Sequence, residues 1–168
     1  LEVWHMPTSA EQSNTLVLGI GNTLLTDEGI GVYVLDGVEK HESPVFEDVT
    51  IMDGGTLSFT LAGAIENCEK LIVIDAAELK SAPGTVQVFE DNDMDTYIVS
   101  GNKKSVHEVS LADVMSITLL SGKLPGKRAL VGIQPAEIDW GDQPTEAVSA
   151  AIPVAVSEIE SILKRWSE

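Results

Sequence analysis

The chain has 168 residues, of which 43% are hydrophobic, and this size and composition are typical of one globular domain with a buried core. Its 27 acidic residues outnumber its 10 Lys and Arg residues, so the formal net charge is -17. That charge argues against nucleic acid and anionic membranes as partners, because both would repel the chain. A partner with a basic tail, or a bound cation, is compatible with it.

The single cysteine, Cys68, rules out a disulfide framework and a thiolate metal cage, and we interpret it as a small buried residue in a helix. No apolar run approaches the ~20 residues of a membrane-spanning helix. The N-terminal stretch lacks the basic start and apolar segment of a signal peptide. We therefore expect a cytoplasmic protein with a flexible segment at 1–14 and one domain at 15–168. Met6 is a candidate native start, which would make residues 1–5 a remnant without function.

The first half of the chain alternates short apolar runs with segments of helical periodicity. The expected elements are a strand at 15–20, a helix at 29–40, a strand at 49–52, a helix capped by Thr56 and a strand at 71–74. Three apolar strands separated by two helices form a βαβαβ pattern. This pattern predicts a parallel sheet with helices on both faces.

The second half is less regular. We expect an edge strand at 85–89, a solvated acidic loop at 90–95, a helix at 110–120, a buried strand at 129–133 and a long helix at 146–166. Pro153 predicts that the last helix is kinked or starts late. The predicted fold is a single-domain α/β three-layer sandwich, with a mostly parallel twisted sheet of about five strands and helices on both faces.

Polar side chains follow the predicted strands at the edge of the sheet where parallel strands end and where ligands bind in such folds. They are Asn22, Asp27 and Glu28 after the first strand, Asp53 after the second, Asp75 and Glu78 after the third, and His107 with Glu108 before the helix at 110. If the topology holds, these acids and one histidine converge on one rim.

A dinucleotide site is one interpretation of the glycine loop, because Gly19 and Gly21 begin a G-x-G-x-x-G pattern. The sixth position of that pattern is Leu24, however, and Asp53 lies too far along to bind the ribose. A pyrophosphate would also face the negative charges of Asp27 and Glu28. These features disfavour a nucleotide.

A divalent cation suits the rim better, because two carboxylates and one imidazole neutralise its charge and leave coordination positions open. Each residue also has a structural interpretation. Glu28 could be a first-turn acid favoured by the helix dipole, Asp75 could cap the segment after its strand, and His107 could be a structural histidine. Spacing alone leaves both interpretations open.

Five segments, in order, resemble the motifs of the hydrogenase maturation proteases, and the resemblance in order and spacing extends over about residues 15–166. They are Gly19-Ile20-Gly21-Asn22-Thr23-Leu24-Leu25-Thr26-Asp27-Glu28-Gly29-Ile30-Gly31, Asp53-Gly54-Gly55-Thr56, Ile74-Asp75-Ala76, Ser105-Val106-His107-Glu108 and Gly132-Ile133-Gln134-Pro135.

The resemblance implies an endopeptidase that recognises nickel already installed in a nickel-iron hydrogenase large-subunit precursor and then removes a C-terminal extension. By correspondence, Glu28, Asp75 and His107 are the expected metal ligands, and Asp53, Glu28 and Asp75 are the expected catalytic residues. Asp53 is a candidate base, or alternatively caps the helix after it. Nickel would arrive with the precursor, and another divalent ion such as zinc or cadmium could occupy the site in isolation. We expect a monomer.

The mechanism expected is attack by water without a covalent intermediate, since no Ser-His-Asp arrangement stands out and Cys68 lacks a neighbouring histidine. Asn22 and Gln134 are candidates for orienting the loop or the peptide. Two alternatives stay open: a metal-dependent hydrolase of another substrate, and a non-catalytic module that checks a partner for nickel.

Overall fold

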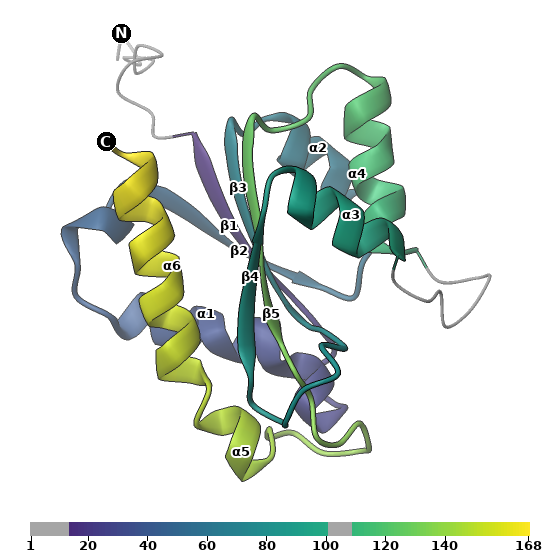
Figure 1. Cartoon of the computed structure of the whole chain (residues 1–168), viewed down its shortest axis with the longest axis vertical. Coiled ribbons are helices and arrows are strands. Elements are labelled where there is room, and N and C mark those ends of the chain that lie inside the picture. Colours follow the sequence, from purple (N-terminus) through teal and green to yellow (C-terminus); the bar gives the residue numbers. More distant parts are fainter. Residues whose placement is uncertain (1–13, 101–108) are drawn as a thin grey trace, which may run out of the picture.

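The computed structural model describes residues 14–100 and 109–168 and contains a five-stranded sheet in the order β2-β1-β3-β5-β4 (Figure 1). Its strands are β1 (Thr15–Ile20), β2 (Val49–Gly55), β3 (Lys70–Ala76), β4 (Val86–Glu90) and β5 (Lys127–Ile133). β1, β2, β3 and β5 are parallel, while β4 runs antiparallel along β5 at the edge. The predicted parallel sheet and edge strand are confirmed.

Helices cover both faces of the sheet and make three layers (Figure 1). One face carries α1 (Ile30–Lys40) and α6 (Ile152–Trp166), and the other carries α2 (Leu61–Glu66), α3 (Asn92–Ser100) and α4 (Leu111–Leu120). Side chains of β1 alternate between the two cores: Val17 packs beneath α1, while Leu16 and Leu18 belong to the opposite core. Burial on both faces explains why this strand is continuously apolar.

The helix expected at Thr56 begins later, at Leu61. β2 continues to Gly55, whose positive φ of 52° turns the chain, and the carbonyl of Gly55 accepts a hydrogen bond from Gly21 N at 2.8 Å. Thr56 therefore belongs to the connection and does not cap α2. Cys68 is buried as predicted but follows α2 instead of lying within it, and its thiol donates to Ile65 O at 3.2 Å.

The acidic segment expected as a loop contains the start of α3, so this prediction is wrong. Met94 is completely buried, and the guanidinium of Arg128 on β5 donates from Nε to Asp95 Oδ1 at 2.9 Å. Tyr97 stacks on Phe89 of β4 with ring centroids 4.2 Å apart. An apolar anchor and a buried cation therefore stabilise this helix despite its polar sequence.

The C-terminal segment forms two helices, α5 (Glu146–Ser149) and α6, with Pro153 in the first turn of α6. The late start predicted from Pro153 is confirmed, because proline is tolerated where its missing N–H has no intrahelical partner. Two short 3-10 helices, η1 (Thr26–Gly29) and η2 (Pro44–Phe46), complete the described elements. In residues 14–100 and 109–168, no helix is both long and apolar enough to cross a membrane.

Candidate active site

A hollow of about 560 Å³ lies at the edge where the parallel strands end. Glu28 and Asp75 both line it, which brings together two of the three predicted metal ligands. The other described lining residues are Ile20, Gly21, Asn22, Leu25, Thr56, Leu57, Val109 and Ile138. An acidic hollow at this edge matches the position where ligands bind in open α/β sheets.

Glu28 reaches the hollow because η1 is packed directly against the ends of β1 and β3. Gly31, in the first turn of α1, has no room for a side chain: a Cβ there would overlap the carbonyl oxygens of Ile74 and Ile20. Gly21 has a φ of 150°, and a Cβ at that position would overlap the carbonyl oxygen of Glu28. The two glycines thus permit the close approach of η1 and α1 to the strand ends, which places Glu28 at the hollow that Asp75 also lines.

Asp75 is the penultimate residue of β3 and pairs in register with Gly132 of β5. It is half-buried and also lines a smaller hollow of about 230 Å³, which Tyr97 of α3 borders. Burial raises the pKa of Tyr97, and the negative charges of Glu78 and Asp75 raise it further. Tyr97 therefore remains a neutral phenol on the far side of Asp75.

Gln134 orients the loop that follows Asp75. Its side-chain oxygen accepts a hydrogen bond from Leu79 N at 2.6 Å, and its amide nitrogen donates to Glu78 Oε2 at 3.1 Å. Asn22 has a similar local role, since its side-chain oxygen accepts from Leu24 N at 3.0 Å. Of the two functions considered for these residues, the structure supports orientation of the loops.

Asp27, which the sequence places on the same rim, is fully buried and points away from the hollow into the loop between β5 and α5. Oδ2 accepts from Ala136 N and Glu137 N, both at 2.9 Å, and Oδ1 accepts from Thr145 N at 2.7 Å. The Thr145 hydroxyl donates to the same carboxylate at 2.9 Å. Burial would raise the pKa of Asp27, but these bonds outweigh it and lower the pKa from its usual value.

Asp53 lies on β2 in register with Gly19, and its exposed carboxylate accepts a hydrogen bond from Gly55 N at 2.8 Å. It is not among the described residues that line the hollow. Because α2 starts at Leu61, Asp53 does not cap that helix. Its catalytic role stays a prediction.

His107 and Glu108, together with the polar segment before them, lie outside the described residues, as does the predicted N-terminal segment apart from Asn14. Within 14–100 and 109–168, no three His, Cys, Asp or Glu side chains are grouped closely enough to hold a metal ion. The described part of the site thus supplies two carboxylates. The predicted ligand set of Glu28, Asp75 and His107 requires the third residue from outside it.

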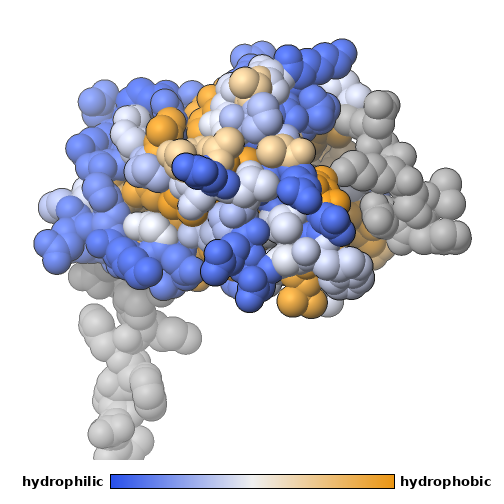
Figure 2. All heavy atoms as spheres, turned by 90° about the horizontal axis from the view of Figure 1, so that it is seen from below, coloured by the Kyte–Doolittle hydropathy of each residue, from blue (hydrophilic) through white to orange (hydrophobic). Residues whose placement is uncertain are grey.

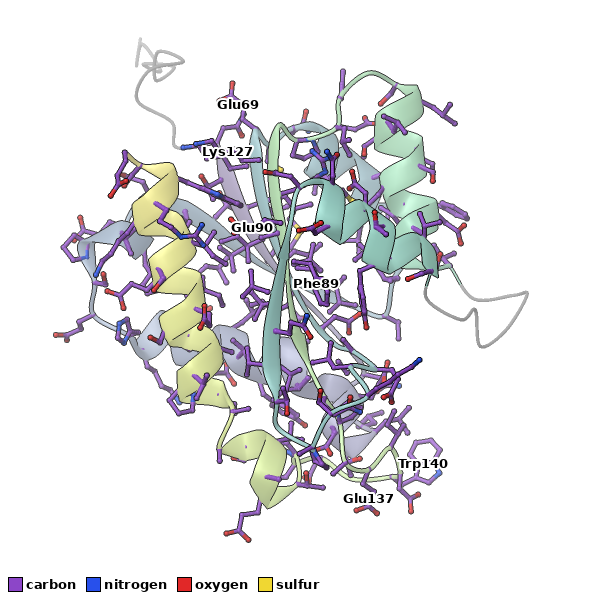
Figure 3. The ribbon with its side chains drawn as sticks, viewed as in Figure 1. Glu69, Phe89, Glu90, Lys127, Glu137 and Trp140 are labelled. Carbon is purple, nitrogen blue, oxygen red and sulfur yellow. The ribbon has the colours of Figure 1, made fainter. Side chains whose placement is uncertain are left out.

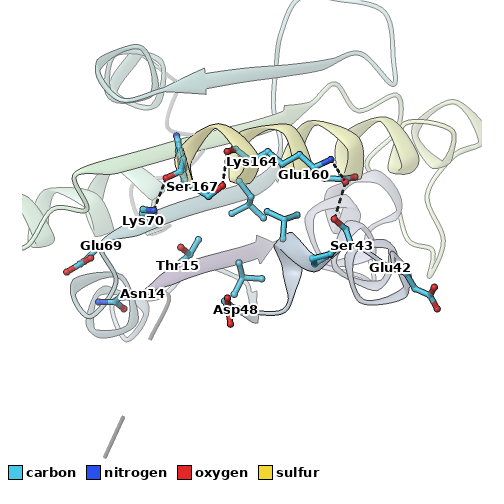
Figure 4. A pocket seen from close by; sticks show the side chains of 15 residues that line it. Asn14, Thr15, Glu42, Ser43, Asp48, Glu69, Lys70, Glu160, Lys164 and Ser167 are labelled. Atoms are coloured by element: carbon cyan, nitrogen blue, oxygen red, sulfur yellow. Dashed lines mark hydrogen bonds and ion pairs between the residues drawn. The ribbon is translucent and has the colours of Figure 1, made fainter. Parts of the chain in front are cut away.

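A larger hollow, of about 790 Å³, lies at the opposite edge of the sheet beside the end of α6 (Figure 4). Its central acid, Glu160, accepts hydrogen bonds from His41, Ser43 and Lys164, at 2.7, 3.1 and 2.9 Å. The bond from Lys164, then those from His41 and Ser43, lower the pKa of Glu160 to about 2. These contacts hold α6 against the segment that contains His41 and Ser43 and leads into η2, so they have a structural role.

Sequence reasoning missed Tyr97, Tyr33 and Thr145. The Tyr33 hydroxyl donates to Asp142 O at 2.7 Å and Thr23 O at 2.9 Å, which ties the two loops of the rim together. The bonds from Tyr33 to Asp142 and from Thr145 to Asp27 join residues more than 100 positions apart, so local spacing carries no signal of them. Tyr97 could have been found from the sequence, because the apolar residues Tyr97 and Ile98 follow the acidic segment at 90–95 and could have indicated that a helix continues there.

The fold and this hollow define an α/β protein with an acidic cleft at the carboxyl edge of a parallel sheet, a position used by enzymes. The sequence model of the hydrogenase maturation protease family, HycI, matches residues 32–162. The chain belongs to this family, which confirms the predicted resemblance, fold class and enzyme class: it is a hydrogenase maturation endopeptidase.

Individual relatives agree with this assignment. The chain is 38% identical to the hydrogenase 2 maturation protease of Escherichia coli over 151 residues, covering 89% of this chain and 90% of that protein. It is 34% identical to the hydrogenase expression/formation protein HupD of Bradyrhizobium diazoefficiens, covering 96% and 83%. Among solved structures, it superposes on the hydrogenase maturating endopeptidase HybD from E. coli with a TM-score of 0.80 at 37% identity, covering 90% and 92%.

Proposed function

We propose that this protein removes the C-terminal extension of a nickel-iron hydrogenase large-subunit precursor after nickel insertion, and that it recognises the precursor by its nickel. The observation that carries the proposal is the position of Glu28 and Asp75 in one hollow at the carboxyl edge. Membership of the hydrogenase maturation protease family supplies the class of reaction.

In this proposal, Glu28 and Asp75 bind nickel held by the precursor, with His107 as the third ligand. Two carboxylates provide oxygen donors and offset the charge of a divalent ion, and an imidazole adds a nitrogen donor. The metal belongs to the substrate, so the isolated protein could hold another divalent ion, such as zinc or cadmium, at the same residues. The protein is expected to act in the cytoplasm as a monomer.

The nickel contact orients the precursor so that the scissile peptide bond lies at the rim of the hollow. A carboxylate, with Asp53 as the candidate, takes a proton from a water molecule, whose oxygen bonds to the carbonyl carbon. The C–N bond then breaks, and the leaving amine takes up the proton. Hydrolysis proceeds without a covalent bond between enzyme and substrate.

The test is mass spectrometry of the source organism's large-subunit precursor after incubation with this protein, with and without nickel in the precursor. Loss of a C-terminal peptide from the nickel-loaded form alone would support both parts of the proposal. Cleavage regardless of nickel would retain the protease and overturn nickel recognition. If neither form is cut, a nickel-checking module or a hydrolase of another substrate would replace the proposal.

Glu28→Ala and Asp75→Ala should each reduce the cleavage rate of the nickel-loaded precursor by more than about 10-fold, because each removes a carboxylate from the metal-binding set. The measurement is the initial rate of appearance of the shortened large subunit. Glu39→Ala is the matched control, since Glu39 is an exposed acid on α1. Equal rates for Glu28→Ala and the control would contradict nickel docking at Glu28.

A further inference from the structure

Three large hydrophobic side chains are exposed beside the hollow: Leu24 is 59% exposed, Ile138 45% and Trp140 80%. We call them the Trp140 patch. Ile138 also lines the hollow that contains Glu28 and Asp75, so the patch and the site are continuous. Figure 3 shows Trp140 projecting away from the body of the molecule, on the same loop as Glu137. Figure 2 views the molecule from below relative to Figure 1, and on this face hydrophobic residues are interspersed with hydrophilic ones.

The backbone beneath the patch is firmly held. Gly141 N donates to Leu24 O at 2.9 Å, and Thr26 N donates to Gly141 O at 2.9 Å, so the segments carrying Leu24 and Trp140 lie side by side. The buried carboxylate of Asp27 fixes the same loop at Glu137 and Thr145.

An exposed indole contributes little to the stability of the fold, because most of its surface stays in water. A rigid frame beneath exposed apolar side chains does, however, reduce the ordering cost of binding a partner. The frame and the exposure together indicate a docking surface rather than part of the core.

The surroundings of the patch are acidic. Glu137, Asp139 and Asp142 flank Ile138 and Trp140 in the sequence and are exposed. Residues 20–36 and 133–150, which include the two loops of the rim, contain neither Lys nor Arg. The complementary partner therefore combines a bulky apolar side chain with neighbouring positive charge.

We infer that the Trp140 patch binds a segment of the precursor polypeptide that carries a bulky apolar side chain next to Lys or Arg. This inference rests on the proposed function, and it names which part of the substrate is recognised besides the metal. The apolar side chain packs on Trp140 and Ile138, while the basic residues face Glu137 and Asp139. Docking here directs the adjoining chain into the hollow that contains Glu28 and Asp75.

The test measures KM and kcat for cleavage of the nickel-loaded precursor by the wild-type protein, Trp140→Ser and Leu120→Ser. Leu120 is the matched control because it is 88% exposed on α4, away from the hollow. Trp140→Ser should raise KM by about 10-fold or more, as expected for a central aromatic contact, with kcat at saturation unchanged. Leu120→Ser should change neither constant. Circular dichroism should show the same thermal unfolding for all three proteins.

A second variant tests the electrostatic part. The double substitution Glu137→Gln and Asp139→Asn retains side-chain oxygens, including the Asp139 acceptor for Trp140 N, but removes two negative charges. It should raise KM at low salt and reduce the dependence of KM on salt concentration.

The failures are distinguishable. If the wild-type protein does not cleave the precursor, the proposed function fails. If it cleaves while Trp140→Ser keeps the wild-type KM, only the docking inference fails. The alternative occupant of the Trp140 patch is a second copy of this chain, and sedimentation velocity would detect the resulting dimer. If the wild-type protein is a dimer and Trp140→Ser dissociates it without changing KM, the inference is also overturned.

Discussion

Asp27 and Glu28 are adjacent in sequence but have different environments. Within the 3-10 turn η1, Glu28 faces the hollow, while Asp27 is buried and binds the loop between β5 and α5 through three N–H groups and one hydroxyl. One carboxylate lines the hollow, and its neighbour holds the loop of the rim in place. Two consecutive acids therefore differ in place: Asp27 has a structural role in the rim, and Glu28 is the residue to which we assign a chemical one in the proposed function.

Replacing Asp27 with Asn should destabilise the protein by about 2–4 kcal/mol. The amide nitrogen of Asn is a donor, and it would face N–H groups whose hydrogen bonds the carboxylate of Asp27 now accepts. Chemical denaturation monitored by circular dichroism would measure the change in the free energy of unfolding. Asp36→Asn is the control, since Asp36 is exposed on α1. A variant as stable as this control would show that the Asp27 contacts contribute nothing net.

The stabilisation by Asp27 should also depend on pH. Its pKa is lowered on folding from a reference value of 3.8, so the folded state favours the ionised form. The resulting stability is present above that reference value and is lost as pH falls through the lower folded-state pKa. Wild-type protein should therefore lose stability relative to Asp27→Asn as pH falls below about 4. Urea midpoints measured at several acidic pH values would check this, and parallel curves for the two proteins would contradict it.

At the residue scale, the sequence identified Glu28 and Asp75 as members of one site because parallel strands end at the same edge. It also listed Asp27 among the polar residues of the same rim, but this carboxylate is buried and bonds to the loop after β5. A sequence shows which residues follow a strand but not which way each side chain points. The partners of Asp27, at Ala136, Glu137 and Thr145, become its neighbours only once β5 has joined the sheet.

Among the elements, the junction between η1, α1 and the ends of β1 and β3 positions Glu28. Gly31→Ala should destabilise the protein by at least about 2 kcal/mol, because the new methyl group overlaps backbone oxygens that cannot move aside independently of the sheet. It should also lower precursor cleavage by displacing Glu28. Gly63→Ala is the matched control.

Gly63 lies in α2, and a Cβ there meets nothing within 4 Å. Alanine at this position should stabilise the protein by about 0.5–1 kcal/mol, because glycine is the less favourable residue in a helix. Thermal unfolding of both variants would measure the difference. Similar effects of the two substitutions would mean that the close approach at Gly31 is not required.

The four parallel strands, the helices α1 and α6 of one face and α4 of the other were predictable from their apolar patterns. The exceptions have physical causes. α3 was predicted as a loop because its stabilising partners, Arg128 and Phe89, lie outside its local sequence. α2 starts later than predicted because Gly55 turns the chain and its carbonyl accepts a hydrogen bond from Gly21 N. The residues after Gly55 therefore belong to this connection and do not form the first turn of the helix.

For the whole molecule, the net charge of -17 implies repulsion between charges that folding brings closer together. Raising NaCl from about 0.02 M to about 0.5 M shortens the screening length from about 20 Å to about 4 Å and should raise the melting temperature. Calorimetry at several salt concentrations would measure this. A melting temperature that fell with salt would show that attractive pairs such as Arg128 and Asp95 outweigh the repulsion.

The contacts of Asp27 also determine when the rim can be completed during synthesis. Glu28, Asp75 and His107 all precede Lys127, whereas Ala136, Glu137 and Thr145 follow β5. A nascent chain that has emerged only as far as α4 possesses the predicted ligands but lacks the loop that binds Asp27 and carries Trp140. The surface beside the hollow therefore forms only after β5 and the loop that follows it have been made, later than all of the predicted ligands.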